Sequence, residues 1–261
     1  MCAIFGFIAR RDSSNPKSPA KPTTARFDPA ALARIIEANV QRGPHAFGLA
    51  WIDGRGRLRM FKQAGLMTDH LPVLRMVEDA RLLVGHLRYA THGDPEDNLN
   101  NHPHPVDGGW LVHNGVIRNH AQLTRRHELT PVSECDTEVL GLLAERVDEV
   151  DGPARRGRLW RMARAAELCE GALATMALWS RPAALVAVRR GNPLHWSPSP
   201  EGMYLATLAQ GLPGSARSLP DNRAWCFRAG PDGTIRSNVL ELEPPAVSWS
   251  FSAGRGSYRG G

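Results

Sequence analysis

The sequence predicts an α+β fold in which packed β-sheets carry helices on their outer sides. The expected elements follow the order strands, helices and strands again, without the regular strand and helix alternation of a doubly wound parallel sheet. Apolar residues make up 42% of the 261 residues and charged residues 22%, which is typical of a globular protein with a sizeable core. No internal repeat is visible, so a single large domain is expected.

The N-terminal half is expected to mix strands and helices. Residues 2–9 are almost entirely apolar and predict a buried strand. Asp28 before Pro29 is typical of a helix start, because Asp caps free N–H groups and proline is tolerated at the first helical position. The pair Asp53-Gly54 predicts a hairpin turn. The expected elements are a strand at 2–9, a helix at 29–41, hairpin strands at 47–52 and 57–62, a helix at 71–81, and strands at 82–86 and 110–113, the last ending in the turn Asn114-Gly115.

The C-terminal half is expected to begin with helices and to end with strands. Apolar residues on one side of 136–150 predict an amphipathic helix, and 153–170 predicts a basic one. The other expected elements are a helix at 119–126 and strands at 172–179, 184–189, 203–206, 225–228 and 239–242. Together these elements define one domain at 2–245, with a polar loop inserted at 11–26 and a flexible Gly/Arg/Ser-rich tail at 246–261.

Cysteine usage indicates a cytoplasmic protein. The 4 cysteines form no CxxC pair and no disulfide framework, so a reducing compartment is expected. The N-terminal apolar stretch is followed by Arg10 and Arg11, whereas basic residues precede the apolar part of a signal peptide. No apolar run is long enough to cross a bilayer. The net charge of +6 permits acidic partners without requiring a nucleic acid.

Cys2 is the first candidate for chemistry. Removal of Met1 would make Cys2 the N-terminal residue, with a thiol and a free α-amino group a few bonds apart. An α-amino group has an ordinary pKa of about 8, so it can serve as the general base for its own thiol, directly or through one water. Taken alone, Cys2 also fits an ordinary small apolar residue that begins a strand.

Further motifs follow Cys2 in a defined order. These motifs contain glycine, histidine and turn-forming residues and lie at expected strand or helix ends. They are Arg42-Gly43-Pro44-His45-Ala46-Phe47-Gly48, Gly85-His86-Leu87-Arg88-Tyr89-Ala90-Thr91-His92-Gly93, His102-Pro103-His104, His113-Asn114-Gly115 and Ser133-Glu134-Cys135-Asp136-Thr137-Glu138. With the N-terminal Met-Cys-Ala-Ile-Phe-Gly, they resemble the class II glutamine amidotransferase domain over residues 2–210. The likeness is strongest to the glutaminase domains of glucosamine-6-phosphate synthase and phosphoribosylpyrophosphate amidotransferase. It implies a four-layer αββα sandwich of the N-terminal-nucleophile hydrolase type.

The resemblance implies L-glutamine as the substrate, and the residue types agree with its charges. Arg88 carries a planar guanidinium that can hold an α-carboxylate at two points, and Thr91 and His92 on the same loop can add hydrogen bonds. Asp136 supplies a carboxylate for the α-ammonium group. Two alternatives stay open, because Arg88 in isolation also fits a surface salt bridge and Asp136 also fits a helix N-cap.

The resemblance also implies an oxyanion hole and supporting residues. Negative charge grows on the amide oxygen when a thiolate attacks, and the implied donors are the side-chain amide of Asn114 and the backbone N–H of Gly115. An Asn-Gly pair is otherwise a common turn. Arg42, Gly43 and Tyr89 are implied to support the nucleophile's end of the pocket, although Tyr89 stands where the glucosamine synthase has tryptophan.

Histidines between residues 86 and 113 raise the question of a metal. His102 and His104 have a spacing that allows both to chelate one ion. No third ligand with zinc-type spacing is evident, and Pro103 between them fits a structural turn. The sequence therefore predicts no metal and no cofactor.

The predicted function is hydrolysis of the glutamine side-chain amide through a γ-glutamyl thioester, with ammonia passed to a separate acceptor enzyme. A separate acceptor is expected because only about fifty residues follow the recognisable region, too few for a synthase domain. A free-standing amide or γ-glutamyl hydrolase is the alternative within the same chemistry. A nucleic-acid-binding protein is the alternative of another class, suggested by the basic residues 155–164 and the Arg/Gly tail. Against it, the aromatic residues show no stacking pattern.

Overall fold

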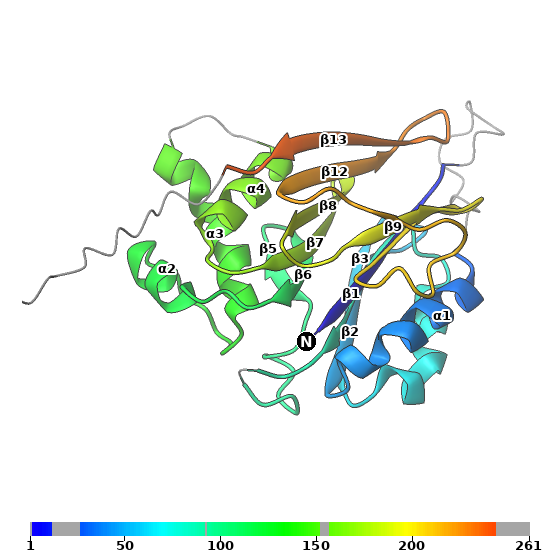
Figure 1. The fold of residues 1–261 in the computed structure, drawn as a ribbon, viewed down its shortest axis with the longest axis horizontal. Coiled ribbons are helices and arrows are strands. Elements are labelled where there is room, and N and C mark those ends of the chain that lie inside the picture. Colours follow the sequence, from blue (N-terminus) through cyan, green and yellow to red (C-terminus); the bar gives the residue numbers. More distant parts are fainter. Residues whose placement is uncertain (1, 12–26, 92, 152–156, 244–261) are drawn as a thin grey trace, which may run out of the picture.

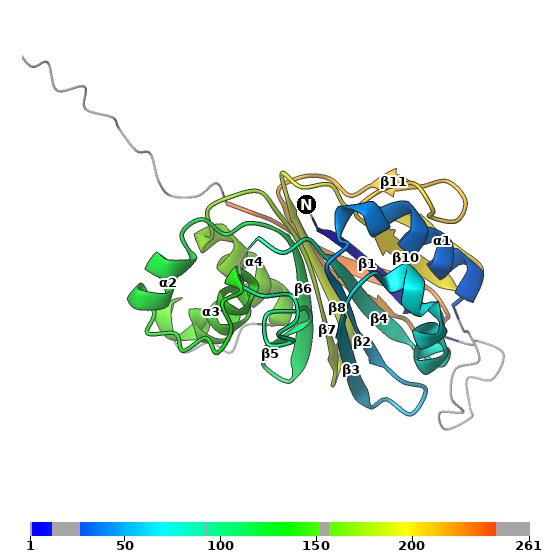
Figure 2. The same cartoon turned by 90° about the horizontal axis from the view of Figure 1, so that it is seen from below.

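Two β-sheets lie face to face in the protein, and each is covered by helices on its outer side. The computed structural model describes residues 2–11, 27–91, 93–151 and 157–243. Figure 2 shows the sheets nearly edge-on, with α1 on one side and α2, α3 and α4 on the other. The neighbouring strands of both sheets pair in antiparallel fashion. This arrangement confirms the expected four-layer sandwich.

The first sheet has seven strands and holds the N-terminus at its centre (Figure 1). Its order is β11 (Arg217–Ser218), β9 (His195–Pro198), β10 (Gly202–Ala206), β1 (Ala3–Ala9), β4 (Leu82–Arg88), β2 (Ala46–Ile52) and β3 (Leu58–Ala64). Strand β1 pairs with β10 on one side and with β4 on the other, where Ala3 lies opposite Leu87. Cys2, which directly precedes β1, therefore lies beside the last residues of β4.

The second sheet has six strands and contributes the opposite wall of the site. Its order is β13 (Ile235–Glu241), β12 (Arg223–Ala229), β8 (Ala183–Arg190), β7 (Leu173–Ser180), β6 (Gly109–Gly115) and β5 (His104–Val106). Strand β6 pairs with β7, so that His113 lies opposite Thr175. The sequence motif at the end of β6 is thereby held in regular sheet structure.

Successive side chains of β1 point to opposite faces of the sheet and pack in two separate hydrophobic cores. Phe5 and Phe7 pack against α1 (Pro29–Asn39), which buries Leu32 and Ile36 on the same face. The other face of β1 points toward the second sheet and packs in the core between the sheets. The outer side of the second sheet is covered by α2 (His120–Arg126), α3 (Asp136–Asp151) and α4 (Arg158–Leu168).

The expected elements are present with a few differences. The segment expected to be an α-helix at 71–81 is instead the 3₁₀ helix η2 (Met67–Val77), which contains Pro72 and is kinked at His70. Pro72 lies inside η2 and lacks the N–H that a continuous α-helix through Met67–Val77 would need. A short 3₁₀ helix, η1 (Val40–Arg42), extends α1, and β6 continues through the expected turn at Asn114. Strands β5, β9 and β11 were not expected.

The described residues do not include most of the loop expected at 11–26 or any of the tail expected at 246–261. The α4 helix starts at Arg158, and residues 152–156 of the expected basic helix also lie outside. Within the part of the chain that the structure describes, no helix has the length and apolar character needed to cross a membrane.

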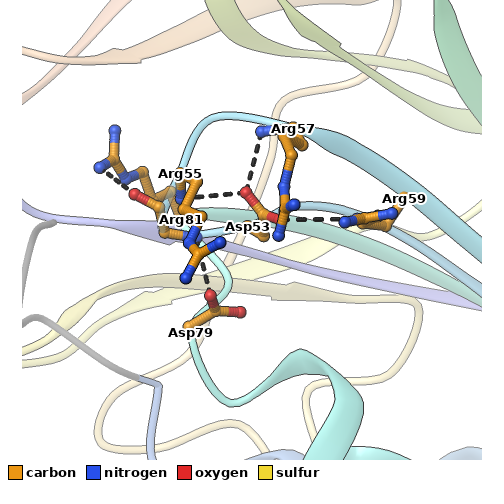
Figure 3. Close-up of polar contacts among 7 residues, drawn as sticks. Asp53, Arg55, Arg57, Arg59, Asp79 and Arg81 are labelled. Atoms are coloured by element: carbon orange, nitrogen blue, oxygen red, sulfur yellow. Dashed lines mark hydrogen bonds and ion pairs between the residues drawn. The ribbon is translucent and has the colours of Figure 1, made fainter.

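The hairpin between β2 and β3 is closed by a buried carboxylate at the end of the sheet opposite Arg88. Asp53 accepts hydrogen bonds from the backbone N–H groups of Arg55 and Arg57, both at 2.9 Å, and forms ion pairs with the side chains of Arg57 and Arg59 (Figure 3). Arg81 also donates to the carbonyl of Gly54. Burial alone would raise the pKa of Asp53, but these hydrogen bonds lower it. The turn is therefore a structural feature.

Candidate active site

Cys2 lies at the entrance to β1, next to the end of β4. Its Sγ atom is 3.3 Å from the backbone nitrogen of Tyr89 and 3.5 Å from the Tyr89 carbonyl oxygen. Arg42 donates from Nε to the carbonyl of Cys2 at 3.1 Å. Two residues further on, Ile4 is held on both sides by Thr207, whose Oγ1 accepts the Ile4 N–H at 2.9 Å and whose N–H binds the Ile4 carbonyl at 2.9 Å. These contacts fix the start of the chain.

The Cys2 thiol is a weak acid in this setting. Burial of the sulfur raises its pKa, and the hydrogen bond from Tyr89 and the positive charge of Arg88 offset this only in part. The carboxylate of Asp136 raises the pKa further. The thiol therefore stays protonated at neutral pH and requires a base before it can act as a nucleophile.

Arg88 ends β4 and is almost fully enclosed, with 3% of its surface exposed. Its guanidinium donates to the side-chain oxygen of Asn101 at 2.9 Å and to the carbonyl of Gly93 at 3.1 Å. The loop that follows is held by His45, whose Nδ1 accepts the N–H of Ala90 at 3.0 Å. The guanidinium is thus oriented by its own loop.

The other predicted residues of this loop differ in position. Tyr89 is 43% exposed, and its ring lies 4.8 Å from the ring of His45. Thr91 is exposed at the surface of the loop. His92 lies outside the described residues, so its predicted role stays a prediction.

Another part of the backbone passes directly over Gly43, which is predicted to support the site. A Cβ at this position would lie 2.1 Å from the carbonyl carbon and oxygen of Leu87, which precedes Arg88. Only glycine permits this approach. The segment that carries Arg42 is thereby packed against the end of β4.

Gly43→Ala is expected to lower the free energy of unfolding by about 1–3 kcal/mol, because the Leu87 backbone must move to admit the new methyl group. Urea denaturation measures the change. Gly157→Ala is the matched control, since a Cβ at Gly157 meets nothing within 4 Å. Its effect should stay below about 1 kcal/mol. Equal losses in the two variants would contradict the close approach at Gly43.

Asn114 and Gly115 end β6 in the second sheet. Asn114 is 2% exposed, and its Nδ2 atom has no hydrogen-bond partner among the described residues. Its carbonyl accepts from Asn192 Nδ2 at 2.7 Å. Gly115 has φ +155°, and a Cβ there would lie 2.4 Å from the Ala172 carbonyl oxygen and 2.6 Å from His113 Nε2. The Asn-Gly pair therefore presents an unused side-chain donor next to a position that only glycine fits.

His86 connects the two walls of the site. Its Nε2 lies 3.0 Å from the carbonyl oxygen of His113, which can only accept, so Nε2 carries the proton. Burial holds the pKa of His86 well below its ordinary value, and the ring is neutral. Because Arg88 follows His86 by two residues and Asn114 follows His113 directly, this hydrogen bond holds both motifs at the same end of the sandwich.

Asp136 is the first residue of α3 and is 8% exposed. Its Oδ2 accepts the backbone N–H of Ile117 at 2.6 Å, which ties α3 to the segment after β6. Among the residues that the structure describes, its Oδ1 has only long contacts, with the hydroxyl of Thr137 at 3.4 Å and the thiol of Cys135 at 3.9 Å. Oδ2 thus holds the start of α3 in place, while Oδ1 can still accept a shorter hydrogen bond from another donor.

The residues before α3 are fixed by Glu138. Its carboxylate accepts the N–H and the hydroxyl of Ser133 at 2.7 and 2.5 Å and the N–H of Val132 at 3.0 Å. Ser133 Oγ in turn accepts the N–H of Cys135 at 3.3 Å. These hydrogen bonds set the positions of Cys135 and Asp136 at the start of the helix.

Buried histidines lie beside this helix start. The rings of His86 and His102 stack at 3.7 Å with an angle of 8°. His102, His104 and Cys135 each offer a ligand atom, and these atoms lie within 4.8 Å of one another. Sequence spacing identified the two histidines but not Cys135, because β6 and α2 separate them along the chain.

Three residues with structural roles in the site were not found in the sequence. Asn101 binds the guanidinium of Arg88, Asn192 binds the carbonyl of Asn114, and Thr207 fixes β1. Asn192 and Thr207 come from segments that are distant in sequence from their partners, whereas Asn101 lies on the loop that follows Arg88. No local pattern marks them.

The chain resembles known enzymes in sequence, although no protein-family model matches it. It is 30% identical to a glutamine–fructose-6-phosphate aminotransferase of Symbiobacterium thermophilum across 99% of this chain and 41% of that enzyme. It is 34% identical to the enzyme of the same name from Escherichia coli across 74% of this chain and 29% of the enzyme. The chain therefore spans less than half the length of these curated relatives.

Solved structures share the fold. The glutamine phosphoribosylpyrophosphate amidotransferase of Bacillus subtilis superposes with a TM-score of 0.66 at 18% identity, over 91% of this chain and 49% of that one. A glutamine aminotransferase class-II domain protein from Silicibacter pomeroyi has a TM-score of 0.59 at 16% identity, over 93% of this chain and all of its own. At such identity these structures show the fold alone. Together with the sequence likeness along nearly the whole chain, they show that this protein belongs to the class II glutamine amidotransferase family.

Proposed function

We propose that the protein hydrolyses the side-chain amide of L-glutamine through a thioester on Cys2 and donates the ammonia to an acceptor enzyme. The observation that carries the proposal is the position of Cys2 directly before the central strand β1, beside the end of β4. At the same end of the facing sheet lies the side-chain amide of Asn114, whose Nδ2 has no hydrogen-bond partner among the described residues. The names of the curated relatives describe transfer from glutamine, which supports glutamine as the nitrogen donor.

The first step requires that Met1 is removed. The free α-amino group of Cys2 then accepts the thiol proton, directly or through one water, and the sulfur attacks the amide carbon. The raised pKa of the Cys2 thiol explains why a base is needed. Collapse of the tetrahedral intermediate forms the γ-glutamyl thioester and releases ammonia, which takes the proton from the α-amino group. A water molecule then attacks the thioester, which releases glutamate and restores the thiol.

The negative oxygen of the tetrahedral intermediate needs donors that are already in place. The Nδ2 group of Asn114 suits this role because it is buried and has no hydrogen-bond partner in the described part of the chain, and a buried donor without a partner is unfavourable by about 1–3 kcal/mol. The N–H of Gly115 is the second proposed donor. Both lie at the rigid end of β6.

Arg88 and Asp136 are proposed to recognise the two charged groups of glutamine. The fork of Arg88 binds the α-carboxylate, with Thr91 and His92 adding hydrogen bonds from the same loop. Oδ1 of Asp136, whose contacts with the described residues are all long, receives the α-ammonium group. Tyr89 and Arg42 hold the sulfur and the carbonyl of Cys2 in place.

Arg88→Lys is expected to raise KM for glutamine by about 10- to 100-fold with little change in kcat, because a lysine keeps the charge but loses a charge-assisted hydrogen bond worth about 1.5–3 kcal/mol. Steady-state kinetics of glutamate release measure the effect. Asn101→Ser is the matched control, since it removes a loop contact of Arg88 and keeps the guanidinium. If Arg88 only supports its loop, both variants will lose thermal stability to the same extent and neither will change KM selectively.

The proposed function is tested by measuring glutamate and ammonia released from glutamine by the purified chain, alone and with protein captured from its host. Stimulation by a captured acceptor would support ammonia transfer to a separate protein, which stays a prediction. A high kcat/KM for glutamine without any stimulating partner would favour the free-standing hydrolase. No release of glutamate under either condition would overturn the proposal.

The basic helix gives little support to the nucleic-acid alternative or to an acidic docking partner. Arg158 donates to the carbonyl groups of Arg181 and Pro182 at 2.7 and 3.1 Å, and its guanidinium lies 5.0 Å from the centre of the Trp179 ring. The other arginines of α4 form ion pairs within the chain, namely Arg161 with Asp107 and Arg164 with Glu167. These side chains are already engaged. Absence of a mobility shift with nucleic acid at physiological salt would exclude this alternative.

A further inference from the structure

Three side chains with strong metal-binding groups meet at the buried start of α3. His102 lies just before β5, His104 begins β5, and Cys135 directly precedes α3. Their exposed fractions are 4%, 1% and 7%. They come from two segments that are far apart in sequence and that the fold brings together. We refer to these three residues as the His-His-Cys cluster.

The distances within the His-His-Cys cluster are close to those of a tetrahedral metal site. Zinc binds sulfur at about 2.3 Å and imidazole nitrogen at about 2.0–2.1 Å, which places tetrahedral ligand atoms about 3.3–3.6 Å apart. His102 Nε2 and Cys135 Sγ are 3.4 Å apart. All three ligand atoms lie within 4.8 Å of one another. Closing around an ion would therefore need side-chain shifts of about 1 Å.

An unpartnered nitrogen provides an independent sign of a missing ligand. His104 Nε2 is buried and has no hydrogen-bond partner among the described residues. Buried polar atoms are nearly always paired, and an unpaired one is unfavourable by about 1–3 kcal/mol. A metal ion at the His-His-Cys cluster would bind this nitrogen.

We propose that His102, His104 and Cys135 bind one thiophilic metal ion of the Zn²⁺ type. Two imidazole nitrogens and a thiolate favour zinc and other soft or borderline ions over Mg²⁺ and Ca²⁺, which prefer oxygen ligands. Binding replaces the thiol proton of Cys135, which leaves as a solvent proton, by a metal–sulfur bond.

Metal binding at the His-His-Cys cluster would change a hydrogen bond next to the proposed glutamine-binding residues. His102 Nδ1 accepts the backbone N–H of His113 at 3.3 Å. If Nε2 of His102 binds the ion, Nδ1 must carry the ring proton, and this hydrogen bond is lost. His113 directly precedes Asn114, and Cys135 Sγ lies 3.9 Å from the Asp136 carboxylate. Bound metal should therefore lower glutamine hydrolysis reversibly, a consequence that depends on the proposed function, whereas metal binding itself does not.

Titration of the wild-type protein with Co²⁺ tests the site directly. The expected result is a sulfur-to-cobalt charge-transfer band and the visible bands of a tetrahedral ion, which saturate at a single ion per chain and disappear when Zn²⁺ is added. Cys135→Ser and His104→Gln should lose these bands. Cys169→Ser is the matched control, because Cys169 is also a buried free thiol but lies outside the His-His-Cys cluster. Cys2→Ala should also retain the bands.

The absence of thiolate bands in the wild-type protein would overturn the proposal, as would bands that disappear in Cys2→Ala. If both cluster variants fail to fold, alkylation of the wild-type protein in mild denaturant tests metal binding instead. Zn²⁺ should slow the labelling of Cys135 at least tenfold and leave the labelling of Cys169 unchanged. Equal protection of both thiols, or of neither, would contradict a specific site.

Discussion

Cys2→Ala is expected to lower glutamine hydrolysis by about 10⁶-fold, as the loss of a nucleophile does in other enzymes. Without the sulfur no thioester can form, and the remaining donors have nothing to stabilise. The side chain of Cys2 lies outside the hydrophobic core, and its contacts are with the backbone of Tyr89. The variant should therefore fold normally, which circular dichroism and thermal denaturation can verify, while coupled assays measure glutamate and ammonia.

The α-amino group is tested separately from the sulfur. Intact-mass measurement should show the loss of Met1, and an uncleaved N-terminal tag should inactivate the enzyme because an amide nitrogen cannot accept the thiol proton. A thiol-reactive glutamine analogue should label Cys2 and spare the other three thiols, which are buried. Burial raises the pKa of Cys169 to about 12, so its thiol is unreactive at neutral pH. Full activity with a blocked amine would refute the self-base mechanism, and full activity of Cys2→Ala would refute the nucleophile.

Asn114→Ala should lower kcat by about 10²–10³, equivalent to about 2.7–4 kcal/mol, with KM for glutamine almost unchanged. The physical reason is that the Nδ2 group has no hydrogen-bond partner among the described residues, and we expect it to gain one when the oxyanion forms. An interaction made only in the transition state affects kcat and not ground-state binding. Steady-state kinetics on the purified variant give both constants.

Asn114→Asp is the matched variant, because it keeps the size of the side chain and removes the donor. Its kcat should fall at least as far as that of Asn114→Ala, since a carboxylate repels the developing negative charge. Asn192→Ser removes the hydrogen bond to the Asn114 carbonyl without touching the donor, and its effect should be much smaller. A change confined to KM in Asn114→Ala would show that the side chain binds substrate and is not an oxyanion donor.

Much of the fold follows from local sequence patterns. The apolar residues 2–9, the Asp28-Pro29 helix start and the Asp53-Gly54 turn produce β1, α1 and the β2–β3 hairpin in the expected places. Asp28 Oδ1 accepts the N–H of Ala30 at 2.9 Å, as an N-cap residue should. The short strands β5, β9 and β11 were missed, because segments of two to four residues carry too little periodicity to be recognised.

The sequence by itself determined the order of the motifs, the family resemblance and the identity of the candidate nucleophile, because these depend on residue type and spacing along the chain. Only the tertiary structure decided that Asn101 orients Arg88, that Asn192 holds the end of β6, and that Cys135 lies beside His102. The contacts of Asn192 and Cys135 join segments that are far apart in sequence, and Asn101 reaches Arg88 from the far end of the loop that follows β4. Such contacts arise from the packing of one sheet on another and of helices on both, and local periodicity carries no information about them.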